Sequence, residues 1–177
     1  AIHRFRWERD RRDYLAAHVL LRQALGTNDY PKDRTGWSLS HTQGLVAVGL
    51  ADANDGSVGV DVEPVGSRDR LVELQQEFVG PSETSVDLLH LWTIKEAVLK
   101  SRGEGITGPR CMSAMLDLAC RALSSRDSDG WTAYEVQDAR GAAIGAWVTQ
   151  LEDHILAAAG APNASSPRLL RTDLRSG

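Results

Sequence analysis

Two carboxylates in the segment Gly59-Val60-Asp61-Val62-Glu63 are the first candidates for chemistry in this 177-residue chain. Side chains alternate along a strand, so Asp61 and Glu63 would share a solvent-facing side while Val60 and Val62 point into a core. Adjacent like charges are unfavourable unless something compensates them, and Mg²⁺ or Mn²⁺ prefers carboxylate oxygens. On this spacing alone, however, an exposed acidic strand edge is the better interpretation.

A second segment, Leu91-Trp92-Thr93-Ile94-Lys95-Glu96-Ala97-Val98-Leu99-Lys100, has the pattern of a helix. Trp92, Glu96 and Lys100 are four residues apart and so lie on one face. The inward face would carry Leu88, Leu91, Ile94 and Val98. Glu96 could be a third oxygen ligand, with Lys100 one turn further on and directed at a phosphate. Taken alone, an exposed Glu96–Lys100 pair contributing about 0.2–0.5 kcal/mol is the better interpretation.

Together the two segments resemble the signature motifs of 4′-phosphopantetheinyl transferases, a G-hydrophobic-D-hydrophobic-E strand followed by a W-[S/T/C]-x-K-E-[A/S]-x-x-K helix. Upstream, Trp37-Ser38-Leu39-Ser40-His41-Thr42 is similar to the family's F-N-L-S-H-S/T segment, and Tyr14 to Arg22 to its L-x-x-x-x-L-L-R helix. The matches keep the family order from about Phe5 to Ala159. They resemble the larger, pseudo-dimeric type that modifies polyketide and peptide synthases, not the small trimeric type.

The resemblance implies an enzyme that transfers the phosphopantetheine arm of coenzyme A to a serine of an acyl or peptidyl carrier protein. By motif match, Asp61, Glu63 and Glu96 would hold Mg²⁺, with Mn²⁺ as an alternative, against the coenzyme A pyrophosphate. Glu96 would also accept the serine proton, directly or through water. Lys100 would stabilise or protonate the departing 3′,5′-ADP.

Three further positions receive roles from the same resemblance. Lys95 would pair with pyrophosphate oxygens or support the helix. Ser40 and His41 match positions that bind the 3′-phosphate of coenzyme A. Without the other motifs, His41 would be read as a structural histidine at the end of a strand.

The chain departs from the family pattern in its basic segments. The family's N-terminal segment, which carries basic contacts to coenzyme A, is missing, and the stretch from Arg22 to Ser40 lacks the usual G-K-P loop. Lys32 and Arg34 are candidate substitutes. The chain opens on Ala1 without an initiator Met, which leads us to expect a transferase domain excised from a multidomain synthase.

The elements that must position these residues indicate an α+β fold. We expect two similar halves, residues 1–56 (truncated) and 57–160, each with a small antiparallel sheet and a long helix and with coenzyme A at their interface, then a disordered tail over 161–177. The predicted helices cover 9–25, 68–78 and 86–102, the last capped by Ser85, and 111–123 is ambiguous. The predicted strands are 37–41, 45–50, 58–63, 131–136, 143–151 and 155–159. The first helix is expected to carry an apolar stripe along Leu15 and Val19, widened by Ala16, Leu20 and Leu21.

The composition of the chain argues against several other classes of protein. With 24 acidic against 20 basic residues the formal charge is −4, which argues against a nucleic-acid-binding domain. No apolar run approaches the roughly 20 residues needed to cross a bilayer, and no apolar signal segment is visible at the start. Two isolated cysteines, Cys111 and Cys120, are typical of reduced thiols in the cytoplasm, where we expect the protein to act.

Two other functions remain open on the sequence. A degenerate relative could bind carrier proteins without catalysis, and it would then bind a carrier but not coenzyme A. The intact set of Asp61, Glu63, Glu96 and Lys100 disfavours this module. A Mg²⁺-dependent phosphoesterase acting on nucleotides would need the carboxylates, but it explains neither the Trp92 to Lys100 pattern nor the Ser40-His41 pair.

Overall fold

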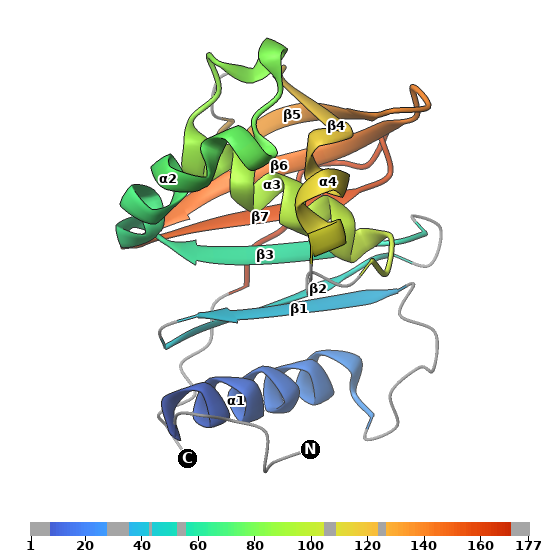
Figure 1. The fold of residues 1–177 in the computed structure, drawn as a ribbon. Helices are drawn as coiled ribbons and strands as arrows, with labels where there is room; N and C mark the ends of the chain where they lie inside the picture. The colour runs from blue at the N-terminus through green and yellow to red at the C-terminus, as the bar shows by residue number, and fades with distance from the viewer. Residues whose placement is uncertain are drawn as a thin grey trace.

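An antiparallel sheet of five strands organises the larger part of the chain (Figure 1). The structure is a computed structural model that describes residues 8–27, 36–42, 44–52, 56–104, 109–123 and 127–170. The strand order β3-β7-β6-β5-β4 leaves β3 and β4 at the two edges. The strands are β3 (Gly59–Pro64), β4 (Leu118–Ala122), β5 (Thr132–Asp138), β6 (Ala143–Leu151) and β7 (His154–Gly160).

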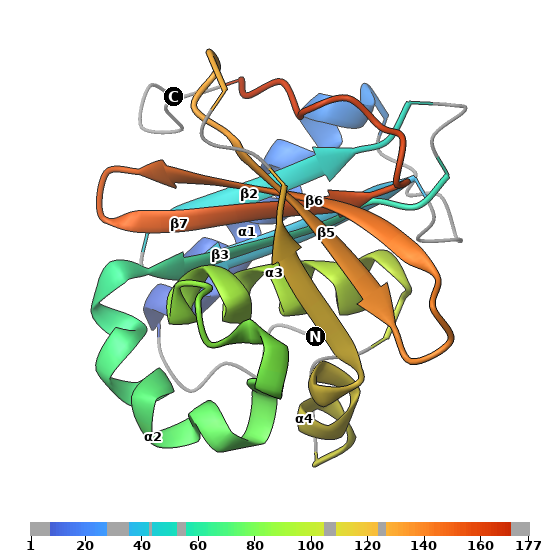
Figure 2. The same cartoon turned by 90° about the horizontal axis from the view of Figure 1, so that it is seen from above.

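One face of this sheet is covered by the helix α3 (Leu88–Ser101), which contacts β3, β7 and β6. The helices α2 (Arg68–Phe78) and α4 (Pro109–Leu116) pack against α3 and against each other on its outer side (Figure 2). Two 3₁₀ helices, Val65–Ser67 and Pro81–Glu83, flank α2. Every residue from Leu91 to Leu99 is buried, because the sheet and the outer helices together enclose α3. None of the helices in the described part of the chain has the length and hydropathy of a membrane span.

A β-hairpin and one helix complete the fold beside β3. The strands β1 (Trp37–Thr42) and β2 (Leu45–Leu50) pair in antiparallel register, with Thr42 opposite Leu45. The helix α1 (Glu8–Leu25) covers the side of the hairpin that faces away from the sheet (Figure 1). The Ser38 hydroxyl of β1 accepts the backbone N–H of Val60 at 3.0 Å. Because β3 is an edge strand, this side-chain contact satisfies a donor that has no strand partner on that side.

Most of the predicted elements are confirmed. The helix over 68–78 has the predicted bounds, and the six predicted strands are present to within about two residues at either end. The ambiguous stretch 111–123 divides into α4 and β4. The predicted Ser85 cap is wrong: Asp87 caps α3, and its carboxylate accepts the N–H groups of Leu89 at 3.0 Å and His90 at 3.2 Å. Aspartate in this position satisfies two of the donors that every helix start leaves free.

The apolar stripe predicted for α1 is confirmed at Leu21 and wrong at Leu15 and Val19. Leu15 and Val19 are 40% and 46% exposed, while Ala17 and Leu21 are fully buried. The helix is turned so that Asp13 faces the hairpin, where its carboxylate accepts the backbone N–H of Gly44 at 3.2 Å. A buried carboxylate needs such a donor, and the small Ala17 side chain allows close packing one turn later.

The two similar halves that the sequence led us to expect are not shown by the described residues. The first part contributes one helix and a two-stranded hairpin, whereas the second contributes the five-stranded sheet and three helices. Residues 161–170 form neither helix nor strand, and Ala164 packs against the apolar cluster around Trp147. The rest of the expected tail, and most of the predicted loops 27–36 and 52–56, lie outside the described residues.

The backbone of β3 approaches the backbone of α3 closely at Gly59. A Cβ built at Gly59 would lie 1.9 Å from the carbonyl oxygen of Ala97 and 2.5 Å from the backbone nitrogen of Ser101. Both are backbone atoms of a rigid helix, so no side-chain rearrangement could make room. Glycine therefore allows β3 to lie directly against α3 at this point.

We predict that Gly59→Ala destabilises the protein by about 1–3 kcal/mol or more, because the added methyl must push the helix away from the strand. Urea unfolding followed by circular dichroism measures this loss. Gly66→Ala is the matched control: a Cβ there meets nothing within 4 Å, so the change should stay within about 0.5 kcal/mol. A Gly59→Ala protein as stable as the control would contradict the close-packing argument.

Candidate active site

Three carboxylates from two distant segments meet between β3 and α3. Asp61 and Glu63 come from β3 and Glu96 from α3, and one oxygen from each lies within 4.8 Å of the other two. The alternation predicted for β3 holds for Val60 and Val62, which are buried. Asp61, however, is only 2% exposed and does not face open solvent, because α3 and β1 close over it.

The two oxygens of Asp61 have different surroundings. Oδ1 accepts the Ser40 hydroxyl at 2.9 Å and the Lys100 ammonium at 2.5 Å. Oδ2 is buried and, while Glu96 is ionised, accepts no hydrogen bond from any residue that the structure describes. An unpaired buried carboxylate oxygen is costly, and a divalent cation bound there would remove that cost. A set of donors that consists only of carboxylate oxygens is the kind that Mg²⁺ and Mn²⁺ prefer.

Glu63 is held in place from both sides. The Trp92 indole N–H donates to Oε1 at 3.3 Å and the Ser67 hydroxyl to Oε2 at 3.2 Å. Trp92 itself is fixed by an edge-to-face contact with Phe78, with ring centroids 5.0 Å apart. Burial, and then the Asp61 charge, raise the pKa of Glu63 above its ordinary value. The sequence did not point to Ser67; its contact arises because the chain turns into a 3₁₀ helix directly after Pro64, the last residue of β3.

The pKa of Glu96 is strongly raised by its surroundings. Burial raises the pKa of Glu96 to about 9, the Asp61 carboxylate adds to the rise, and Lys100 opposes it. The surroundings therefore favour the protonated form of Glu96 at neutral pH. A divalent cation bound among the three carboxylates would take the place of this proton.

Lys100 lies one helical turn beyond Glu96 and completes the site. Its ammonium bonds Asp61 and also donates to the Ser40 hydroxyl at 3.0 Å. These residues border a cavity of about 320 Å³ between β1, β3 and α3, which His41 also lines. The His41 ring meets Tyr14 of α1 edge-on, with centroids 6.4 Å apart. Six of the seven residues singled out in the sequence thus surround one cavity.

The seventh, Lys95, does not reach this cavity. Its ammonium is completely buried on a different side of α3, where it donates to the Phe78 carbonyl and to Glu83 Oε2, each at 2.7 Å. Glu83 in turn accepts the backbone N–H groups of Gly80 at 2.6 Å and Cys120 at 2.7 Å. The predicted contact of Lys95 with pyrophosphate oxygens is therefore not supported by its position. Its contacts fit the other expectation, support of the helix, because they join α3 to the segment after α2 and to β4.

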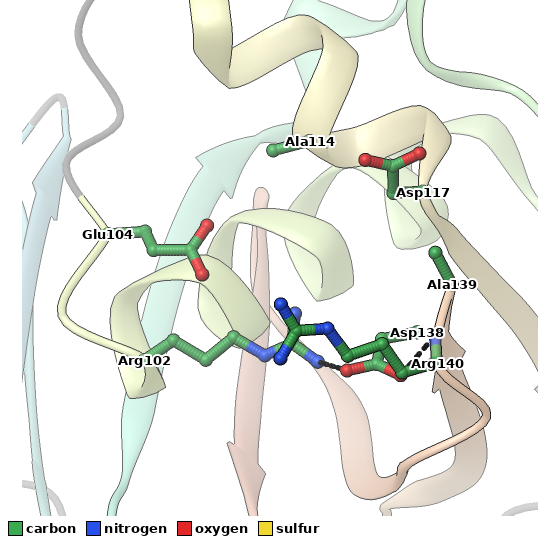
Figure 3. Close-up of a pocket in the computed structure, with 7 residues that line it drawn as sticks. All are labelled: Arg102, Glu104, Ala114, Asp117, Asp138, Ala139 and Arg140. Atoms are coloured by element: carbon green, nitrogen blue, oxygen red, sulfur yellow. Dashed lines mark hydrogen bonds and ion pairs between the residues drawn. The ribbon is translucent and has the colours of Figure 1, made fainter.

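A second cavity, of about 390 Å³, lies at the C-terminal end of α3 (Figure 3). Arg102 pairs with Asp138 at 2.9 Å, and Figure 3 shows the Arg140 guanidinium beside this pair. Backbone N–H groups in the β5–β6 turn, with Arg102, hold the pKa of Asp138 below its usual value. Glu104 and Asp117 also line the cavity. We interpret this cavity as a structural junction between α3 and the turn, since its lining mixes three carboxylates with two guanidinium groups and the Arg102–Asp138 ion pair joins the two elements.

Comparison with known protein families gives one match. The model of the 4′-phosphopantetheinyl transferase superfamily matches residues 57–159, more than half of the chain. The matched region contains β3 and α3, and so the three carboxylates and Lys100. The helix α1 and the hairpin, which contribute Ser40 and His41, precede it. No curated protein matches the chain significantly.

We predict that Lys95→Met lowers the free energy of unfolding by about 3–5 kcal/mol, because it leaves the buried Glu83 carboxylate without its counter-charge. Urea unfolding measures the loss. The control is Arg121→Met, which breaks the exposed ion pair between Arg121 and Glu135 and should cost less than about 1 kcal/mol. Equal losses in the two variants would show that the buried pair has no special structural role.

We also predict that the metal-free protein becomes less stable as pH rises between about 5 and 9. The raised pKa of Glu96 means that the folded state binds this proton more tightly than the unfolded state, so the stabilisation is lost as the proton leaves. Thermal unfolding in EDTA across this range measures the slope. In Glu96→Gln the slope should flatten, and saturating Mg²⁺ should oppose the loss at high pH in the unsubstituted protein. If Glu96→Gln left the slope unchanged, the pH dependence of stability could not be assigned to Glu96.

Proposed function

Because the chain belongs to the 4′-phosphopantetheinyl transferase superfamily, we propose that it transfers the 4′-phosphopantetheine arm of coenzyme A to a serine of an acyl or peptidyl carrier protein. Membership of the superfamily implies the transfer of this arm to carrier proteins. The observation that carries the proposal is the convergence of Asp61, Glu63 and Glu96 on one point, with Lys100 beside it.

The reaction needs a positively charged group that offsets the negative charge of the coenzyme A diphosphate. The serine Oγ attacks the β-phosphorus, the bond from this phosphorus to the bridging oxygen breaks, and 3′,5′-ADP leaves. Asp61, Glu63 and Glu96 would hold Mg²⁺ or Mn²⁺, which when bound neutralises charge on the diphosphate oxygens. The unpartnered Oδ2 of Asp61 supports this assignment.

Two residues would handle the proton and the leaving group. In its ionised form, which a cation bound among the three carboxylates would favour over the protonated form, Glu96 would accept the serine proton, directly or through water. Lys100 would contact the phosphate oxygens of the departing 3′,5′-ADP, because its ammonium borders the same cavity. His41, on the β1 wall of that cavity, would bind the 3′-phosphate. Ser40 would assist by positioning, since its hydroxyl already bonds both Asp61 and Lys100.

The motif order supports assignment to the larger, pseudo-dimeric type, serving a polyketide, fatty-acid or peptide synthase in the cytoplasm. The buried free thiol of Cys120 is compatible with such a reducing compartment. A catalytically inactive carrier-binding module is the alternative from the sequence. It gains no support from the site, since a module that only binds carriers has no use for three clustered carboxylates of which two are buried.

Incubation with coenzyme A, Mg²⁺ and a set of apo carrier proteins tests the function. We expect electrospray mass spectrometry to show the mass of the phosphopantetheine arm added to a carrier serine. Glu96→Gln and Asp61→Asn should each lower the transfer rate at least about 100-fold, since each removes a charged ligand while retaining its shape.

The matched control is Glu135→Gln, which removes an exposed carboxylate on β5 and should leave the rate within about twofold. Absence of transfer to every carrier, from folded protein that binds coenzyme A, would overturn the proposed function. Near-normal rates in Glu96→Gln would overturn the role of the triad.

A further inference from the structure

Lys100 and a divalent cation would compete for the same carboxylate. The Lys100 ammonium lies 2.5 Å from Asp61 Oδ1, while Asp61 Oδ2 is buried, accepts no hydrogen bond from an ionised neighbour among the described residues, and belongs to the acidic cluster with Glu63 and Glu96. A dipositive ion on Oδ2 would therefore be separated from a monopositive ammonium by a single carboxylate group. The repulsion between the two is strong in a site that excludes most of the solvent.

The surroundings of Lys100 allow its ammonium to move away from Asp61. Its side chain is 20% exposed and borders the cavity, so a swing of the flexible four-carbon stem can carry the ammonium toward solvent. Lys95, five residues earlier on the same helix, is completely buried and held by the Phe78 carbonyl and Glu83. Of the two lysines of α3, only Lys100 is placed to move without opening the core.

When no cation is bound, the negative charges around Asp61 attract the Lys100 ammonium and hold it beside Asp61. Asp61, Glu63 and Glu96 face one another, with Lys100 in contact and Arg70 acting on Glu63 from α2. A counter-ion stabilises such a cluster of acids, and Lys100 supplies a charge that is part of the chain. A divalent cation makes this charge unnecessary.

We propose that Lys100 is an exchangeable counter-ion: it leaves Asp61 when a divalent cation binds, and a phosphate oxygen of the co-substrate then receives it. The idea rests on the proposed function, because the phosphate is that of coenzyme A. Two consequences follow. Lys100 weakens cation binding to the free protein, and it couples cation and coenzyme A so that each tightens the other. The coupling is reciprocal, since the phosphate takes up the ammonium that the cation displaces.

The first test uses Mn²⁺ as the probe and isothermal titration calorimetry as the measurement. In the absence of coenzyme A, Lys100→Met should bind Mn²⁺ at least about fivefold more tightly than the unsubstituted protein, because the competitor is gone. The factor by which coenzyme A tightens Mn²⁺ binding should fall several-fold in the variant, after correction for Mn²⁺ bound to free coenzyme A.

The control is Arg102→Met, which removes the same charge two residues further on but pairs with Asp138 outside the site. It should leave Mn²⁺ affinity within about twofold, which separates direct competition from a general loss of positive field. Unchanged or weaker Mn²⁺ binding in Lys100→Met would overturn the exchange.

The second test needs no substitution. The chain contains three lysines, Lys32, Lys95 and Lys100, so selective ¹⁵N-lysine labelling gives a simple ammonium spectrum. Mg²⁺ should shift the Lys100 signal and leave that of Lys95 in place; a Lys100 signal insensitive to saturating Mg²⁺ would overturn the proposal. Exchange without transfer to any carrier would refute the proposed function alone, and transfer without exchange would refute this inference alone.

Discussion

The direct contact of β3 with α3 is the constraint on which the site depends. At Gly59 the strand backbone meets the helix backbone with no side chain between them. This contact sets the separation at which Asp61 and Glu63 face Glu96, and therefore whether one ion can reach all three. The enclosure of α3 by the sheet and the outer helices keeps that separation fixed, because a helix packed on every side cannot move outward alone.

The site gathers three carboxylates where burial makes their negative charge unfavourable. Three carboxylates, two of them buried, are stabilised by hydrogen bonds from Ser40, Ser67 and Trp92 and by the Lys100 ammonium, and burial raises the pKa of Glu96. Such strain is typical of sites built to receive a ligand of opposite charge. A divalent cation is the ligand that would relieve all of it, which links the stability of the fold to the proposed chemistry.

Two lysines of α3 have different roles because they differ in burial. Lys95 and Lys100 have the same side chain and both bond a carboxylate. Lys95 is enclosed with its partner Glu83 and holds three segments together, while Lys100 lies at the border of a cavity and can exchange its partner. The hairpin contributes to this division, since Ser40 holds the Asp61–Lys100 pair from the β1 side. Although α1 and the hairpin precede the region that matches the superfamily, they complete the site.

The sequence by itself determined the strand and helix that carry the site and the faces on which Asp61, Glu63, Glu96 and Lys100 lie, because side-chain periodicity is a local property. Only the tertiary structure decided that Lys95 turns away to Glu83, that α1 buries Ala17 instead of Leu15, and that Asp61 is covered. These outcomes depend on which buried polar group finds a partner across the fold. That partner is set by packing between segments far apart in the chain, which no local pattern records.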